Sequence, residues 1–232
     1  MAAEFVNAMC SPPRGNCHPA EAVKTLVVNV NVDDTQVDRL IDDAIRLFRD
    51  KSFDCVFTLS PLDRPAELGK RLTARGFTQG AWAATMVHDP SAKQSLLRSA
   101  AQVEESDECD YDNWAEVMCR SFALPRAMGD VGRCVLFVPD VRRYLARVQG
   151  VLAGTTLLYS QFGMGYIDLV GTLPEHRQQG VASALVTQAV SDSRSLGNRW
   201  TTLETTAGSD AERLFEGYGF RTAYYRYRYT LP

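Results

Sequence analysis

The residues from Tyr166 to Leu185, YIDLVGTLPEHRQQGVASAL, have the types and the spacing that bind a phosphate group. The apolar stretch from Ile167 to Thr172 predicts a strand, a short loop comes after it, and the next helix begins with Arg-x-x-Gly-x-Ala. The first amides of a helix lack partners within the helix and lie at the positive end of its dipole. Gly180 and Ala182 have little or no side chain, so a pyrophosphate can approach the backbone. The segment therefore predicts a phosphate-binding strand, loop and helix.

Two common phosphate-binding motifs do not fit this segment. It lacks the lysine and the second glycine of a P-loop, and it is not G-x-G-x-x-G. A helix start whose small residues only permit close packing stays open as the alternative interpretation.

The elements that must position this segment alternate between helix and strand. Apolar spacing predicts one amphipathic helix at Asp34 to Lys51, capped by Asp34 or Thr35, and another at Val181 to Leu196. Shorter helices are predicted at 65–75, 111–122 and 209–217, with an irregular region around Pro125 and Gly129. Strands are predicted at 25–32, 54–59, 82–87, 101–104, 141–148, 151–161, 165–172, 200–205 and 221–231.

The two ends of the chain share a local pattern. LTARGF at Leu72 to Phe77 aligns with FEGYGF at Phe215 to Phe220, and each closes a short helix that comes after a strand. This similarity predicts a diverged internal duplication. The polar stretch from His88 to Ser99 is the predicted linker between the copies.

A family resemblance rests on this motif and on three elements nearer the C-terminus. With Thr172 in place of the usual valine, the segment resembles V-x-P-x-x-R-x-x-G-x-G/A, motif A of the GNAT superfamily of acyl-CoA N-acyltransferases. The strand at Leu203 to Thr205, the helix at Asp210 to Phe215 and the pair Gly219-Phe220 resemble the family's L-E-V strand, A-x-x-L-Y helix and G-F turn. The resemblance covers about Ala101 to Pro232.

The resemblance implies an α/β fold with a mixed sheet, of the GNAT acyl-CoA N-acyltransferase type. We expect a diverged GNAT-like half without a cofactor motif at residues 1–95 and the catalytic GNAT domain at 96–232. The first half contains no R-x-x-G-x-G/A, so we expect it to wall the acceptor cleft instead of binding cofactor.

The resemblance also implies acetyl-CoA as co-substrate, with no metal. The end of the motif A strand, here Val170, Gly171 and Thr172, would bond the pantetheine arm. The proton donor to the departing thiolate is usually the tyrosine of the L-Y pair, which here is Phe215 beside the cofactor. The loop amides would hold the pyrophosphate at Arg177, Gln178, Gln179, Gly180, Val181, Ala182 and Ser183.

Acetyl transfer to an amine needs a base, because a free alkylammonium has a pKa of about 10. Glu204 is the first candidate, since related enzymes often have a glutamate base on this strand. Asp168, on the motif A strand, is the second. Tyr218 could replace the missing proton donor at Phe215, although a tyrosine at a helix end more often packs on the core.

The composition of the chain limits the kinds of binding partner and the cellular location that we expect. The net charge of −3, from 25 basic and 28 acidic residues, argues against a nucleic-acid-binding surface, and no segment is predicted to cross or target a membrane. Six cysteines without C-x-x-C and three scattered histidines predict free thiols in the cytoplasm. A monomer or homodimer is expected.

These observations predict an acetyl-CoA-dependent N-acetyltransferase that acts on the primary amine of a small metabolite, by direct attack in a ternary complex. A peptide or protein amine is one alternative acceptor. A non-catalytic acyl-CoA-binding regulatory module is another alternative. It is favoured by Phe215 and by Gly208, which stands where the family often has an asparagine.

Overall fold

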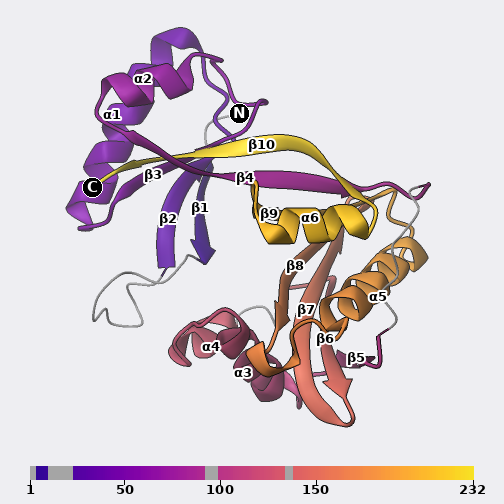
Figure 1. The fold of residues 1–232 in the computed structure, drawn as a ribbon. Helices are drawn as coiled ribbons and strands as arrows, with labels where there is room; N and C mark the ends of the chain where they lie inside the picture. The colour runs from indigo at the N-terminus through magenta and orange to yellow at the C-terminus, as the bar shows by residue number, and fades with distance from the viewer. Residues whose placement is uncertain (1–3, 10–22, 92–98, 134–137) are drawn as a thin grey trace. The chain divides into compact units, whose positions relative to one another are not determined.

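The computed structural model describes residues 4–9, 23–91, 99–133 and 138–232. The chain forms the mixed α/β fold that the sequence predicts (Figure 1). Within the described residues, no helix is both long and apolar enough to span a membrane. In chain order the elements are β1 (Glu4–Met9), β2 (Val23–Val28), α1 (Asp34–Asp50), β3 (Cys55–Leu59), α2 (Leu68–Ala74), β4 (Thr78–His88), β5 (Gln102–Ser106), α3 (Tyr111–Ser121), α4 (Ala127–Gly132), β6 (Val141–Val148), β7 (Val151–Gln161), β8 (Met164–Thr172), the 3-10 turn η3 (Pro174–His176), α5 (Val181–Ser195), β9 (Trp200–Thr206), α6 (Asp210–Gly217) and β10 (Phe220–Leu231).

The chain divides into two compact units that are not continuous in sequence. The first unit contains Met1–Thr85, Thr205–Ser209 and Thr222–Pro232, and the second contains Met86–Glu204 and Asp210–Arg221. The strand order is β1-β2-β3-β10-β4-β9-β8-β7-β6-β5, and β4, β9 and β10 have residues in both units. The sequence-based division into a GNAT-like half at 1–95 and a catalytic domain at 96–232 describes an ancestral duplication, not these contact-based units, and it stays a prediction. Residues 92–98 of the predicted linker lie outside the described residues.

In the first unit, α1 packs its apolar stripe into a core with β3. Val37, Ile41, Ala44 and Phe48 are buried, as the spacing predicts. The predicted cap was wrong: the residue before the helix is Asp33, and no side chain caps it. The first turn instead lies beside a basic residue of α2, with Asp34 accepting from Arg71 at 2.7 Å.

Two predictions about short helices differ from the structure. The helix predicted at Pro65 begins at Leu68, because a turn closed by Leu68 N–H and the Pro65 carbonyl (3.0 Å) precedes it. The region around Gly129, predicted to be irregular, contains α4. Glycine weakens a helix in isolation. Here it lets α4 approach α3, since a Cβ at Gly129 would lie 3.1 Å from Ala115 Cβ.

In the second unit, tight hairpin turns set the register of the central strands. Gln149 and Gly150 have φ of 52° and 80°, and Phe162 and Gly163 have φ of 53° and 74°. Two successive residues with positive φ form the turns that suit the twist of paired strands. Strands β5 to β8 are antiparallel, whereas β9 runs parallel to β8.

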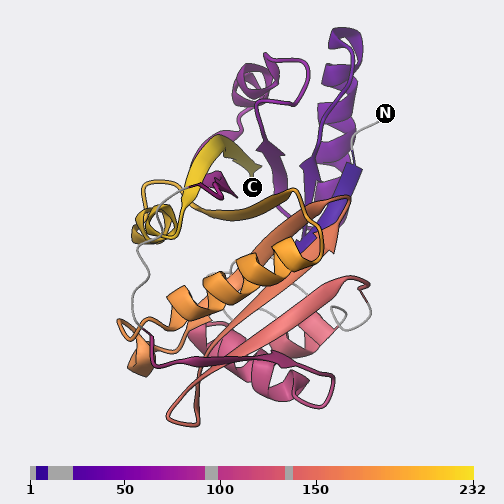
Figure 2. The ribbon, with the colours of Figure 1, turned by 90° about the vertical axis from the view of Figure 1, so that its right-hand side faces the viewer.

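Helices cover both faces of these strands (Figures 1 and 2). On one face lies α5: a Cβ at Gly154 of β7 would lie 2.5 Å from Val181 Cγ1. On the other face lies the end of α3, where a Cβ at Gly171 of β8 would lie 2.7 Å from Ser121 Cβ. Glycine at these positions lets both helices pack directly against the strand backbones.

The close approach at Gly154 predicts the effect of adding one methyl group. Gly154→Ala should lower the free energy of unfolding by about 1–3 kcal/mol, because its Cβ would meet α5 and the Gly171 carbonyl, 2.8 Å away. Gly217→Ala is the matched control, since a Cβ there meets nothing within 4 Å. Urea unfolding measures both. Equal stability of the two variants would contradict this packing.

Candidate active site

The parallel strands β8 and β9 separate within the second unit. Their pairing runs from Met164 with Trp200 to Ile167 with Leu203. Beyond this last pair, β8 continues to Thr172 and β9 to Thr206. The edge of β8 that faces β9 therefore has backbone groups at residues 168–172 that do not pair with β9. An edge of this kind can pair with an extended ligand.

A bulge in β8 marks the point of separation. The register with β7 shifts between Thr155 and Leu157, and Leu169 has a φ of 52°. Two hydrogen bonds hold the bulge: Leu169 N–H donates to Asp168 Oδ1 at 2.7 Å, and Thr156 Oγ1 donates to the Asp168 carbonyl at 2.8 Å. These two bonds fix the orientation of the Asp168 side chain and of its carbonyl.

Asp168 and Glu204 are the first residues beyond the last pair on their two strands. The paired residues before them, Ile167 and Leu203, are each 1% exposed and lie on the α5 face. Because side chains alternate along a strand, the two carboxylates lie on the opposite face, the one that α3 covers. The point of separation thus carries two acidic groups on one face.

The protein surroundings of Asp168 disfavour its charge. Desolvation by nearby protein atoms raises the pKa of Asp168, and the negative charge of Glu204 raises it further. The hydrogen bond from Leu169 N–H lowers this pKa, but its effect is smaller than that of desolvation. The residue is nevertheless exposed to solvent. A carboxyl group that is crowded by protein and still open to water suits exchange of a proton with a ligand.

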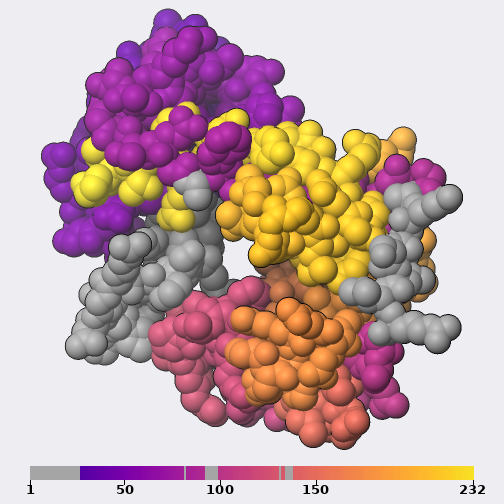
Figure 3. Space-filling model, viewed as in Figure 1, coloured from indigo at the N-terminus to yellow at the C-terminus, as the bar shows by residue number. Residues whose placement is uncertain are grey.

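The loop after β8 leads into α5 with unpaired amides. Gly180 precedes the helix with a φ of 75°, and no side chain caps it. The first hydrogen bond of the helix runs from Ala184 N–H to the Gly180 carbonyl at 3.0 Å. The amides of residues 181–183 come before it and therefore have no partner within the helix. Figure 3 shows the orange segment that contains this loop on the surface that faces the viewer. The arrangement fits an anionic group such as a pyrophosphate.

Gly180 is required for two reasons. Its positive φ is unfavourable for other residues, and a Cβ would lie 3.1 Å from Ser99 Cβ. Ser99 Oγ also donates to the Gln179 carbonyl at 3.5 Å. Contact with the segment before β5 is a constraint that the motif alone does not predict.

The predicted cofactor residues differ in exposure. Exposed side chains belong to the loop, and buried ones face the helix or the core. Arg177, Gln178 and Gln179 are exposed; Val170, Thr172, Gly180 and Ala182 are half-buried; Gly171, Val181, Ser183 and Phe215 are buried. The structure brings the strand and loop groups together in sequence order, joined by η3.

Tyr218 lies in the core beside Phe215. The two rings make an edge contact with centroids 6.5 Å apart, and both residues are less than a tenth exposed. Tyr218 forms a hydrogen bond with Ser183 in the first turn of α5, and burial raises the pKa of its hydroxyl. The sequence had no signal for this contact, since 35 residues separate the two positions.

Sequence reasoning missed the end of α3 as part of this region. Ser121 and Phe122 lie over Gly171, and Arg120 Nη2 donates to Glu175 Oε1 of η3 at 2.6 Å. Nothing in the periodicity of α3 marks these residues. Among the described residues, no group of three or more His, Cys, Asp or Glu side chains is placed to hold a metal ion.

The raised pKa of Asp168 predicts a stability change in Asp168→Asn. The folded chain binds the carboxyl proton more tightly than the unfolded chain, so the wild type loses stability as pH rises from the usual value of 3.8 through the raised one. The variant avoids this loss and keeps an acceptor for Leu169 N–H. It should melt higher than the wild type at pH 7, and the gain should shrink toward pH 4.

Thermal melts between pH 4 and 8 measure this difference, with Asp210→Asn as the control at an exposed aspartate. A variant that melts below the wild type at pH 7 would show that the ionised form of Asp168 is favoured.

Comparison with known proteins identifies the family. The sequence profile described as the acetyltransferase (GNAT) family matches residues 100–220. A search of curated proteins gives no match. The fold is similar to a GCN5-related N-acetyltransferase from Kribbella flavida, with a TM-score of 0.70, 17% identity and coverage of 91% of this chain and 82% of that one.

Two other solved structures share the fold. A GCN5-related N-acetyltransferase from Sphaerobacter thermophilus has a TM-score of 0.70 and 15% identity, over 99% of this chain and 75% of that one. A tandem GNAT protein from the clavulanic acid biosynthesis pathway has a TM-score of 0.64 and 14% identity, over 84% and 69%. Because the sequence profile matches more than half of this chain, the chain belongs to the GNAT family of acetyltransferases.

Proposed function

We propose that this acetyltransferase moves the acetyl group of acetyl-CoA to the primary amine of a small metabolite, by direct attack in a ternary complex. The observation that carries the proposal is the pair of carboxylates, Asp168 and Glu204, at the point where β8 and β9 separate. These carboxylates lie beside the open strand edge, so either of them could act as a base on an amine that attacks a thioester bound there.

Acetyl-CoA would lie along the open edge of β8. The backbone of Val170, Gly171 and Thr172 has no β9 partner, so it can pair with the amides of the pantetheine arm as a strand would. The uncapped amides at the start of α5 can take the pyrophosphate. Gly180 and the exposed loop from Arg177 leave the backbone accessible from solvent.

Glu204 is our choice for the base. The acceptor arrives as an ammonium, and Glu204 takes its proton directly or through a water. The amine nitrogen then bonds to the thioester carbon, the carbon–sulfur bond breaks, and the nitrogen loses a second proton to solvent as the neutral amide forms. Desolvation and the charge of Glu204 both raise the pKa of Asp168. Asp168 is the second choice.

Tyr218 is our choice for the proton donor to the departing thiolate. Phe215, at the family's usual tyrosine position, has no proton to give. The raised pKa of Tyr218 keeps its hydroxyl protonated at neutral pH, and its bond with Ser183 joins it to the first turn of α5. A thiolate leaves readily enough that solvent protonation would reduce the rate without abolishing it.

A cytoplasmic location completes the proposal, with the chain as a monomer or homodimer. Cys55, Cys109 and Cys119 are free, and two of them are buried. Free thiols are typical of a reducing compartment.

Glu204→Gln tests the base. Its kcat should fall by about 10²–10⁴-fold, because an amide cannot take the proton, while the KM for acetyl-CoA stays the same. Thiol release from acetyl-CoA with a panel of small amines and lysine peptides measures this. Glu216→Gln, the same change at an exposed position of α6, should keep the wild-type rate.

The same assay separates the alternatives. Full activity of Glu204→Gln would move the base to Asp168. Turnover of lysine peptides in preference to free amines would indicate a polypeptide acceptor. Binding of acetyl-CoA without amine-dependent thiol release would indicate a regulatory module.

Ala182→Glu tests the pyrophosphate position. A negative charge in the first turn favours the helix but repels a bound anion, so the variant should fold and bind acetyl-CoA at least about tenfold more weakly. Thr187→Glu places the same charge on an exposed later turn of α5 and should bind normally. The ligand-induced rise in melting temperature measures binding, with CoA as a second ligand and ATP as a control. Normal binding of acetyl-CoA by Ala182→Glu would show that the pyrophosphate does not bind at the first turn of α5.

A further inference from the structure

Arg143 of β6 is a buried cation that has no charged partner among the side chains that the structure describes. The residue is 8% exposed. Its Nη2 donates to the Ser106 carbonyl at 3.4 Å, which is a weak bond, and its Nε has no hydrogen-bond partner. Burial of an unpaired guanidinium is costly, and buried charges in proteins are normally paired.

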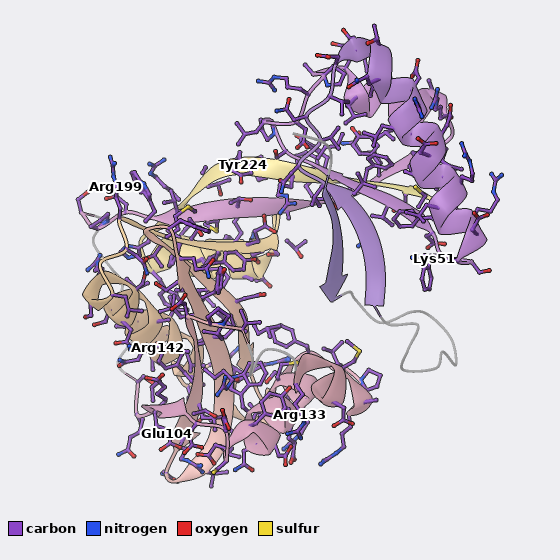
Figure 4. All side chains as sticks on the ribbon, turned by 180° about the vertical axis from the view of Figure 1, so that it is seen from behind. Lys51, Glu104, Arg133, Arg142, Arg199 and Tyr224 are labelled. Atoms are coloured by element: carbon purple, nitrogen blue, oxygen red, sulfur yellow. The ribbon has the colours of Figure 1, made fainter. Side chains whose placement is uncertain are left out.

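The neighbouring arginines of the same strand have acidic partners. Arg142, labelled in Figure 4, lies 3.8 Å from Glu105 and 3.9 Å from Asp192, and Arg147 lies 2.6 Å from Glu104. In the described parts of the chain, Arg143 forms no such ion pair. Two acidic side chains lie outside those that the structure describes, Glu4 and Glu21. The chain therefore offers Arg143 few possible counter-charges.

The strand register places Arg143 on the same face as the candidate base. Arg143 pairs with Leu157 of β7, and Leu157 pairs with Asp168 of β8. Paired residues point to the same side of a sheet, so all three lie on the face that α3 covers. Arg143 and Asp168 are two strand spacings apart, which is about 10 Å between their Cα atoms. The row runs from exposed Asp168 to buried Arg143, whose bond to the Ser106 carbonyl holds the guanidinium on the β5 side, the far end of the row.

We propose that Arg143 binds a carboxylate of the acceptor, and that the acceptor is therefore an amine with a carboxylate at the far end of a chain of several carbons, as in an ω-amino acid. A planar guanidinium with free N–H groups matches a carboxylate through paired hydrogen bonds. The amine of the same molecule then lies at the other end of the row, beside Asp168 and Glu204. This inference rests on the proposed function and adds the substrate class to it.

Matched acceptor pairs test the proposal. 6-Aminohexanoate is compared with pentylamine, and 4-aminobutyrate with propylamine, each pair differing by one carboxylate. The wild type should have a kcat/KM at least about tenfold higher for the carboxylate-bearing member of at least one pair. Equal or better use of the bare amines would overturn the inference and leave the proposed function intact. No turnover of any amine would contradict the proposed function itself.

Variants then assign the preference to Arg143. Arg143→Met should lose at least about tenfold in kcat/KM for the carboxylate-bearing acceptor and keep the wild-type value for the bare amine and the KM for acetyl-CoA. Arg143→Lys should retain part of the preference, since it keeps the charge. Arg142→Met, on the opposite face of the same strand, should retain all of it.

Stability gives a second measurement that does not depend on activity. A buried charge without a partner opposes folding, so Arg143→Met should melt at or above the wild-type temperature. A large drop in melting temperature would show that Arg143 already has a stabilising partner in the chain and would overturn the proposal.

Discussion

The separation of β8 from β9 after Ile167 and Leu203 is the constraint on which the site depends. Those two apolar side chains pack on the α5 face and keep the strands paired up to that point. Beyond it, the bulge at Leu169 turns β8 out of register, and its backbone faces an opening instead of a partner strand. The same separation places Asp168 and Glu204 beside one another at the start of the opening.

In the proposed function, charge is distributed along this region so that each ligand group would meet its complement. The start of α5 offers amides and a positive dipole end, the point of separation offers two carboxylates, and β6 offers a buried guanidinium. Each of these groups is unfavourable for the isolated protein: a helix without a side-chain cap, a desolvated acid, and a buried cation that has no acidic partner in the described parts of the chain. Unfavourable groups of these kinds are typical of binding sites, where a ligand supplies the missing partner.

Much of the second unit could be predicted because local rules agree there with the tertiary structure. Gly150 and Gly163 mark hairpin turns, and the strands between them follow apolar periodicity, so their bounds agree within a residue or so with the prediction. Helix α4 was missed because glycine opposes a helix locally and favours one only through contact with α3. The burial of Arg143 and the contact of Tyr218 with Ser183 depend on register and packing, which no short stretch of sequence encodes.

Hydrogen exchange at the amides of residues 168–172 and 181–183 tests the central claim most directly, because these backbone groups are the ones that the strand separation and the uncapped helix leave free. Addition of acetyl-CoA should slow exchange in both segments and leave α1 unchanged. Protection of the start of α5 without protection of β8, or no protection in either segment, would contradict the claim that the opening between the strands holds the cofactor.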